Sequence, residues 1–198
     1  MNTIFKFFFL LLLLTLTLSV IPTNAEASIY DDTVRLHILA NSDKNDDQEL
    51  KILLRDKLLE KYGKNMQMCE SAEDAEDLFS TLIPTIEEDC KTWIKEQGYS
   101  YSVKCQLSEE WYDTRVYEDF TLPCGIYKSL RIIIGNGDGK NWWCVMYPPL
   151  CTSLATEKAD KDDSIINYTN EELYLIENSQ YNIKFKSLEL ISQLFYKK

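Results

Sequence analysis

The sequence contains few residues that could build a metal or phosphate site. It has a single histidine, His37, in 198 residues, and none of its six cysteines forms a C-x-x-C pair. The usual spacings of zinc ligands are therefore missing. The glycine-rich stretch Gly135 to Lys140 is not a Walker sequence, and it lacks the ligand set of a calcium loop. We expect no metal and no cofactor, and we interpret this stretch as a tight turn.

Basic residues are also scarce. The chain has 21 lysines and arginines against 32 aspartates and glutamates, which gives a formal net charge of −11. A domain this acidic would be repelled by nucleic acid and by anionic membrane surfaces. The charge favours solubility and argues against both of those partners.

The N-terminal segment lacks charge after Lys6. An apolar run from Phe7 to Ile21 is shorter than the roughly 20 residues that span a bilayer comfortably, and it is typical of a signal-peptide core. Ala25 and Ala27 fit the small-residue rule for signal peptidase, so we predict a signal peptide over 1–27, cleaved between Ala27 and Ser28. The alternative is an uncleaved anchor, with the apolar run extended across Lys6. Either interpretation places the rest of the chain outside the cytoplasm.

The exported part, residues 28–198, is long enough for one domain with a core. Its helix patterns are a segment from Asp46 to Tyr62 that ends at Gly63, and a segment from Ser71 to Gln97 that Pro84 either kinks or divides. The pairs Asp46/Glu49 and Ser71/Asp74 are spaced as capping boxes. Both helices therefore precede most of the strands.

Strand patterns occupy the middle of the chain. They run over Thr33–Ile38, Tyr99–Ser108, Ser129–Ile134 and Trp142–Tyr147, with a weaker pattern over Trp111–Phe120. The last two strong strands flank the turn Gly135–Asn141, so we predict that they pair as a hairpin or meander. A polar loop at about 152–170 and a closing helix containing Leu188, Ile191, Leu194 and Phe195 follow. The pattern predicts an α+β fold in which N-terminal helices pack on a small antiparallel sheet and a C-terminal helix closes the domain.

All six cysteines lie in the exported part, where disulfides are the default. The sequence does not determine how they pair. Cys144 and Cys151 are favoured because the turn Tyr147-Pro148-Pro149 between them would bring the two ends together. Cys90 is predicted equally well as a buried thiol or as half of a bridge.

His37 is the first candidate for chemistry. In a catalytic interpretation it is a general base, Asp43 orients it, and a cysteine elsewhere is the nucleophile. The competing interpretation is structural: His37 lies in an alternating strand beside Arg35, and Asn41-Ser42-Asp43 is a strand-to-helix turn with local hydrogen bonds. We prefer the structural interpretation, because an exported cysteine nucleophile would have to escape disulfide formation.

Trp142 and Trp143 would point to opposite faces of a strand. One ring could then enter the core while the other stays available to a protein partner. Packing of both rings in the core is an equally good interpretation.

The segments VRLHILANSD, DDQELKILLRDKLLEKY and LPCGIYKSLRIIIGNGDGKNWWCVMYPPLC occur in that order. They closely resemble the stage II sporulation protein R family of endospore-forming bacteria, from about Val34 to Cys151, and the final IKFKSLELI also looks like the family's ending. The chain departs from the pattern at Cys124, where a small residue such as alanine is more typical. Cys69, Cys90 and Cys105 are also extra, so no family-wide disulfide scheme is carried over.

The resemblance implies a signalling protein that is made in the forespore and exported into the space between the forespore and mother-cell membranes. Proteins of this family trigger a membrane-embedded aspartic protease, the stage II sporulation protein GA, which removes the pro-sequence of sigma factor E. The messenger itself would perform no cleavage. The candidate partner-binding or motif positions are Arg35, His37, Asn41, Asp43, Asn141, Trp142, Trp143, Pro148 and Pro149. A secreted Cys/His-dependent hydrolase and a cell-wall-binding module are the alternative functions.

Overall fold

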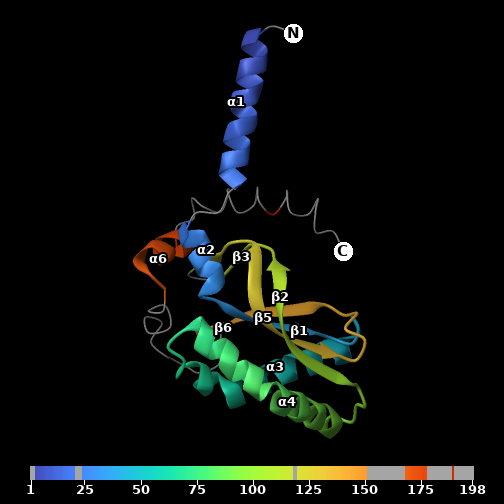
Figure 1. The fold of residues 1–198 in the computed structure, drawn as a ribbon. Helices are drawn as coiled ribbons and strands as arrows, with labels where there is room; N and C mark the ends of the chain where they lie inside the picture. Colours follow the sequence, from blue (N-terminus) through green and yellow to red (C-terminus); the bar gives the residue numbers. More distant parts are fainter. Residues whose placement is uncertain (1–2, 21–23, 118–119, 151–167, 178–188, 190–198) are drawn as a thin grey trace. The chain divides into compact units, whose positions relative to one another are not determined.

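The computed structural model describes residues 3–20, 24–117, 120–150, 168–177 and 189. The chain divides into two compact units (Figure 1). We call residues 30–110 and 126–169 the sheet unit, and residues 1–29, 111–125 and 170–198 the hairpin unit. Helices together with a four-stranded sheet confirm the α+β class. The expectation of one exported domain stays a prediction.

The sheet has the strand order β2-β5-β1-β6. Its strands are β1 (Val34–Leu39), β2 (Val103–Tyr112), β5 (Gly125–Ile134) and β6 (Asn141–Tyr147). β1 runs parallel to β5 and antiparallel to β6. All six residues of β1 are buried, as expected for a central strand with neighbours on both edges.

The predicted hairpin between the last two strong strands is wrong, because β1 lies between β5 and β6. The turn that joins them crosses the end of β1, where the Gly139 amide donates to the Ala40 carbonyl at 2.9 Å and the Asp138 amide to the Asn41 carbonyl at 3.3 Å. Glycine-rich turn chemistry indicates a chain reversal. It does not indicate whether an earlier strand inserts between the two arms. The sheet is therefore mixed, whereas we predicted an antiparallel one.

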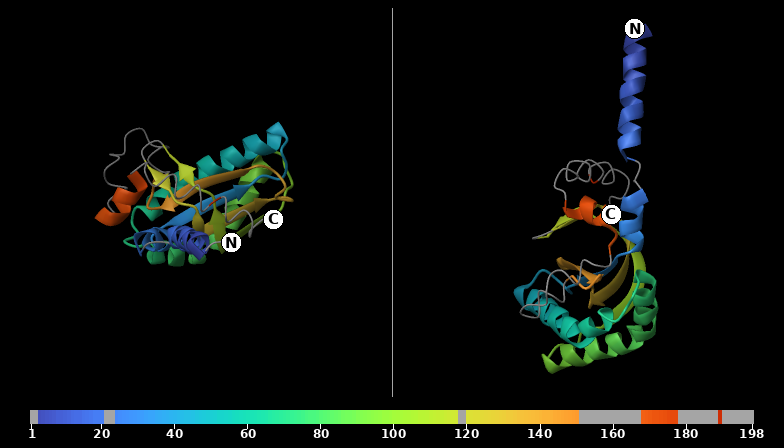
Figure 2. Two further views of the ribbon diagram at one scale, coloured as in Figure 1. Left: turned by 90° about the horizontal axis from the view of Figure 1, so that it is seen from above. Right: turned by 90° about the vertical axis from the view of Figure 1, so that its left-hand side faces the viewer.

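Two long helices, α3 (Asn45–Met66) and α4 (Ala72–Glu96), cover one face of this sheet (Figures 1 and 2). They pack against each other and against β1, and α3 also contacts β6. The helical spacing predicts one buried stripe of Leu50, Leu53, Leu54 and Leu58 on α3. Leu50, Leu54 and Leu58 are buried as predicted, whereas Leu53 is only half-buried. The buried stripe continues through Tyr62 and Met66, so packing carries the helix past Gly63, where we predicted its end. A glycine inside a helix costs only about 1 kcal/mol relative to alanine.

The two predicted capping boxes differ in outcome. The α3 helix begins after Lys44 with no side-chain cap, so the Asp46/Glu49 box is not formed. In α4 the Ser71 hydroxyl accepts a hydrogen bond from the Asp74 amide at 3.0 Å, as predicted. The α4 helix then runs unbroken through Pro84. Buried residues on both sides of the proline, among them Phe79 and Ile86, anchor the two halves of the helix.

The strand β2 begins later and ends later than its alternating pattern predicted. Tyr99 and Tyr101 precede the strand, and their rings stack with centroids 5.5 Å apart. Gly98, at φ 82°, and Tyr99, whose amide donates to the Ile94 carbonyl at 3.1 Å, belong to the end of α4. The first residues of the pattern are therefore used to terminate the helix.

The hairpin unit contains α1 (Thr3–Val20), most of α2 (Asn24–Asp31), a short antiparallel pair of β3 (Arg115–Val116) with β4 (Thr121–Leu122), and α6 (Asn170–Glu177). α6 packs against β4. None of the helices in the described ranges combines the length and hydropathy required to cross a membrane. Most of the predicted polar loop, and the closing helix except for residue 189, lie outside the described residues.

The Ser71 cap gives a stability prediction. Ser71→Ala removes the acceptor for the Asp74 amide, and we expect the free energy of unfolding to fall by about 1 kcal/mol. Ser80→Ala, at an exposed position inside the same helix, is the matched control and should leave stability within about 0.5 kcal/mol. Urea unfolding followed by circular dichroism measures both variants. Equal stability of the two variants would contradict the capping role.

Candidate functional site

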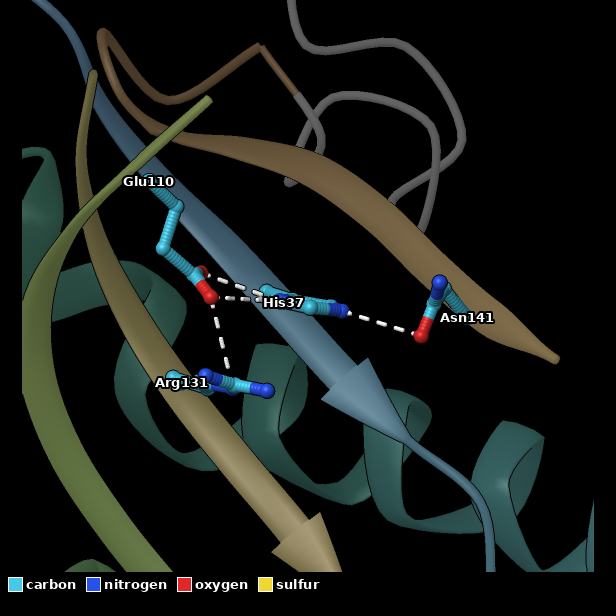
Figure 3. A network of polar contacts seen from close by, with 4 residues as sticks. All are labelled: His37, Glu110, Arg131 and Asn141. Carbon is cyan, nitrogen blue, oxygen red and sulfur yellow. Dashed lines mark hydrogen bonds and ion pairs between the residues drawn. The ribbon is translucent and has the colours of Figure 1, made fainter. Parts of the chain in front are cut away.

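His37 lies in the middle of β1, the central strand. Its Cα partner on β5 is Arg131 and its Cα partner on β6 is Trp143. Side chains at paired positions share a face of the sheet, so these three residues form a row across three strands. Glu110, from the edge strand β2, reaches into the same row (Figure 3).

The polar contacts of His37 close this row into a network. Its Nδ1 lies 2.9 Å from Glu110 Oε2 and 3.2 Å from Oε1, and its Nε2 lies 3.1 Å from Asn141 Oδ1. Arg131 Nε lies 3.3 Å from Glu110 Oε1. We call His37, Glu110, Arg131 and Asn141 the His37 network. Trp143 covers the imidazole, with ring centroids 3.6 Å apart and planes inclined by 22°.

The network fixes the charge of its carboxylate. Burial raises the pKa of Glu110, but the hydrogen bond from His37 and the electrostatic interactions with His37 and Arg131 outweigh it. The pKa of Glu110 therefore lies below its ordinary value of 4.5. An ionised carboxylate holds the imidazole and the guanidinium together at neutral pH.

This geometry does not assemble the catalytic set considered from the sequence. A general base needs a ring nitrogen that faces the proton it removes. Both ring nitrogens of His37 instead face Glu110 and Asn141. Asp43, the residue considered for orienting His37, accepts a hydrogen bond from the Lys140 amide at 2.7 Å. His37 therefore acts as a bridge between strands.

A second cluster joins the turn after β1 to the glycine-rich turn before β6. Asn41 Nδ2 donates to Asp47 Oδ2 at 2.9 Å, and Asn41 Oδ1 accepts from the Asn136 amide at 3.1 Å. Ser42 Oγ donates to the same Asp47 oxygen at 2.5 Å. We call Asn41, Ser42, Asp43 and Asp47, with the turn Gly135 to Lys140, the Asn41 clasp.

The backbone of Lys140 is held from both sides in this clasp. Its amide donates to Asp43 Oδ1, and its carbonyl accepts from Lys51 Nζ at 2.9 Å. Lys51 also donates to Gln48 Oε1 at 2.7 Å and is almost fully buried. Burial lowers the pKa of Lys51, and the Asp43 carboxylate opposes that shift. The clasp therefore fixes where β6 begins.

Glycine is required in the turn for two different reasons. Gly135 and Gly137 have φ of 57° and 69°. Glycine adopts these values without the steric cost of a Cβ, which fits the tight turn predicted for this stretch. A Cβ on Gly139 would lie 2.3 Å from the Ser42 carbonyl oxygen, so backbone meets backbone there. The glycines therefore allow the turn to pack closely against the Asn41 loop.

The clasp also stabilises a buried charge. Burial raises the pKa of Asp47, but hydrogen bonds from Ser42, Asn41 and Tyr101 outweigh it. The resulting pKa lies below the ordinary 3.8. A carboxylate with this many donors is held ionised, so Asp47 serves as the fixed acceptor around which the loop closes.

The remaining predicted motif residues are also engaged within the fold. Trp142 lies with its ring centroid 5.1 Å from the guanidinium carbon of Arg55 on α3, while Trp143 stacks on His37. The two rings therefore contact opposite sides of the sheet, and both stay partly exposed. Arg35 is fully buried, with its guanidinium carbon 5.0 Å from the Tyr127 ring centroid.

The proline turn after β6 is buried at Pro148 and Pro149, and the Tyr147–Pro148 peptide bond is cis. Four cysteines in the described part of the chain form no disulfide: Cys69, Cys90, Cys105 and Cys124. Cys144 is buried and is not one of them. Its predicted partner, Cys151, lies outside the described residues, so this pairing stays a prediction.

The predicted cleavage point, Ala27–Ser28, lies in α2. Ala27 is exposed, whereas its neighbours Glu26 and Ile29 are buried. The structure does not test cleavage itself.

Sequence reasoning missed Glu110, Arg131, Asp47 and Lys51. Charged residues on strands and helices are usually assigned to the solvent face, and no local motif marks these four. One signal was available. A lone histidine in a strand flanked by apolar residues needs hydrogen-bond partners for its ring nitrogens. An acidic side chain on a neighbouring strand can be one of these partners.

The chain matches a known protein family over most of the described sheet unit. The family model described as stage II sporulation protein R matches residues 30–157. That range covers more than half of the chain and contains both the His37 network and the Asn41 clasp. The chain belongs to the stage II sporulation protein R family.

A named relative of this family member is the stage II sporulation protein R of Bacillus subtilis (strain 168). The two are 35% identical over 128 residues, which is 65% of this chain and 57% of that protein. The chain thus spans a little over half the length of the curated relative it matches. No solved structure gives a significant match.

The Asn41 clasp can be tested with two asparagines of the same two loops. Asn41→Ala removes a donor to the buried Asp47 and the acceptor for the Asn136 amide, so we expect a loss of about 1–3 kcal/mol in the free energy of unfolding. Asn136→Ala is the matched control, because Asn136 contributes its backbone amide to the clasp and its side chain is exposed. Urea unfolding measures both. A control loss as large as that of Asn41→Ala would contradict the role of the Asn41 side chain.

The His37 network predicts an acid-sensitive contribution to stability. Because folding lowers the pKa of Glu110, this contribution is complete above the ordinary value of 4.5 and is lost as pH falls through the lower folded value. Glu110→Gln should therefore lower the melting temperature at pH 7 and approach the unmodified protein below pH 4.5. Thermal unfolding across pH 7 to 3 measures this. A constant difference at every pH would contradict the assigned charge.

Proposed function

We propose that this chain is an exported messenger of endospore formation, which activates the membrane-embedded aspartic protease that processes pro-sigma factor E. The single observation that supports this most is membership of the stage II sporulation protein R family. The expected partner is the stage II sporulation protein GA in the mother-cell membrane. The expected place of action is the space between the forespore and mother-cell membranes.

The N-terminal segment supports export. Large apolar side chains surround α1 and are 45–67% exposed, from Ile4 to Leu14. Such a helix is poorly suited to water on any face, whereas a signal-peptide core or an anchor meets an apolar environment. The acidic remainder of the chain suits a soluble messenger.

The geometry of the sheet unit supports a messenger without catalysis. His37 has its ring nitrogens committed to Glu110 and Asn141, and its third contact is the Trp143 ring. A Cys/His-dependent hydrolase would need a thiol beside that ring. A messenger is recognised through its surface: Asn141 is exposed, and the partly exposed Trp142 and Trp143 follow it on β6. We propose this end of β6 as a contact region for the protease.

The export step can be tested in sporulating cells that lack their own messenger. We expect the full chain to restore pro-sigma factor E processing, and a chain without residues 1–27 to fail, because the unexported protein remains on the wrong side of the membrane. Since that deletion also removes Glu26 from α2, a second variant keeps the helix: Leu12→Arg with Leu13→Arg, which interrupts the apolar run. Immunoblots of the sigma factor measure processing.

Immunoblots of the messenger itself provide the control for equal accumulation. Full processing by either unexported form would contradict the need for export. His37→Gln, tested in parallel, separates the hydrolase alternative. A folded His37→Gln protein that signals fully is compatible with a messenger and incompatible with a histidine-dependent hydrolase.

A further inference from the structure

Two of the free thiols meet in the core of the sheet unit. Cys90 is on α4 and Cys105 is on β2, and they are 0% and 6% exposed. The two thiols lie within reach of each other, and Cys105 is the largest influence on the Cys90 thiol. The other two cysteines that form no disulfide in the described chain lie elsewhere: Cys69 follows α3, and Cys124 is in the hairpin unit.

The surrounding contacts hold this pair in register. Glu87 lies one helical turn before Cys90 on the same side of α4, and its Oε2 accepts the Cys105 backbone amide at 3.0 Å. Ile86 and Ile94, four residues on either side of Cys90, are both buried. The helix therefore cannot slide along the strand without breaking the Glu87 contact and exposing apolar surface. The Glu87 contact thus holds Cys105 beside the turn of α4 that carries Cys90.

We propose that Cys90 and Cys105 form a redox pair that closes to a disulfide between α4 and β2. A low-molecular-weight disulfide such as oxidised glutathione is the oxidant. The thiolate of one cysteine attacks it, which forms a mixed disulfide and releases one glutathione thiolate. The second cysteine then attacks the protein sulfur of the mixed disulfide and releases the other. The protein loses two thiol protons and two electrons, and the oxidant becomes two molecules of reduced glutathione.

The environment of the pair determines when this exchange is fast. Exchange requires a thiolate. In the folded protein the hydrogen bond with Cys105 and burial both raise the pKa of the Cys90 thiol. We therefore expect slow exchange in the native protein and fast exchange while the chain folds, when the thiols are still exposed to solvent. The bridge would tie the half of α4 that follows Pro84 to an edge strand.

The experiment uses the full-length chain in mild detergent, because α1 is apolar. The chain is reduced and unfolded in urea, and it is then refolded either with oxidised glutathione or with excess reductant. Remaining thiols are alkylated, and the linked peptides are identified by mass spectrometry. We expect a peptide pair that joins Cys90 to Cys105 only in the oxidised sample, together with a melting temperature several degrees higher.

Two variants act as controls. Cys69→Ser with Cys124→Ser should keep the linked peptide pair, and Cys90→Ala with Cys105→Ala should melt at the same temperature in both buffers. Folded protein from the oxidising buffer in which Cys90 and Cys105 are both alkylated would overturn the proposal. A bridge from either of them to a different cysteine would also overturn it. The peptide map of the unmodified chain decides the matter even if the alanine variant fails to fold. It does so independently of the messenger function.

Discussion

The insertion of β1 between β5 and β6 is the constraint on which the rest of the sheet unit depends. It places His37 at the centre of a row whose other members come from three different strands. It also brings the end of β1 against the glycine-rich turn, where the Asn41 clasp closes. The segment VRLHILANSD and the segment that begins at Gly135 therefore contact each other in the fold, although nearly a hundred positions lie between them in the sequence.

The two clusters use charge in the same way. In each, a largely buried carboxylate is held ionised by donors from more than one segment: Glu110 by His37 and Arg131, and Asp47 by Ser42, Asn41 and Tyr101. A buried charge is costly unless it is paired and hydrogen-bonded. Such groups therefore favour one arrangement of strands and loops over others that would leave the charge without donors. The polar residues of these motifs specify the fold and fix the position at which β6 begins.

Local patterns predicted most of the elements, and non-local pairing explains most of the errors. The Ser71 cap, the leucine stripe of α3 and the positive φ of Gly135 follow from neighbours within one turn of chain. The order of the strands does not, because no local feature of β5 or β6 indicates that β1 will separate them. Glu110 and Arg131 were missed for the same reason: their function depends on a histidine that is distant in sequence and adjacent only in the folded sheet.

The position of β1 also determines when the sheet can form. Leu36 pairs with Cys144 on one side and with Leu130 on the other, so a strand that leaves the ribosome early has to wait for partners that are made much later. Contacts of such high sequence separation form slowly. The centre of this sheet therefore cannot close until the segment around β6 has also been made. The topology itself thus makes the four-stranded sheet one of the last parts of the fold to form.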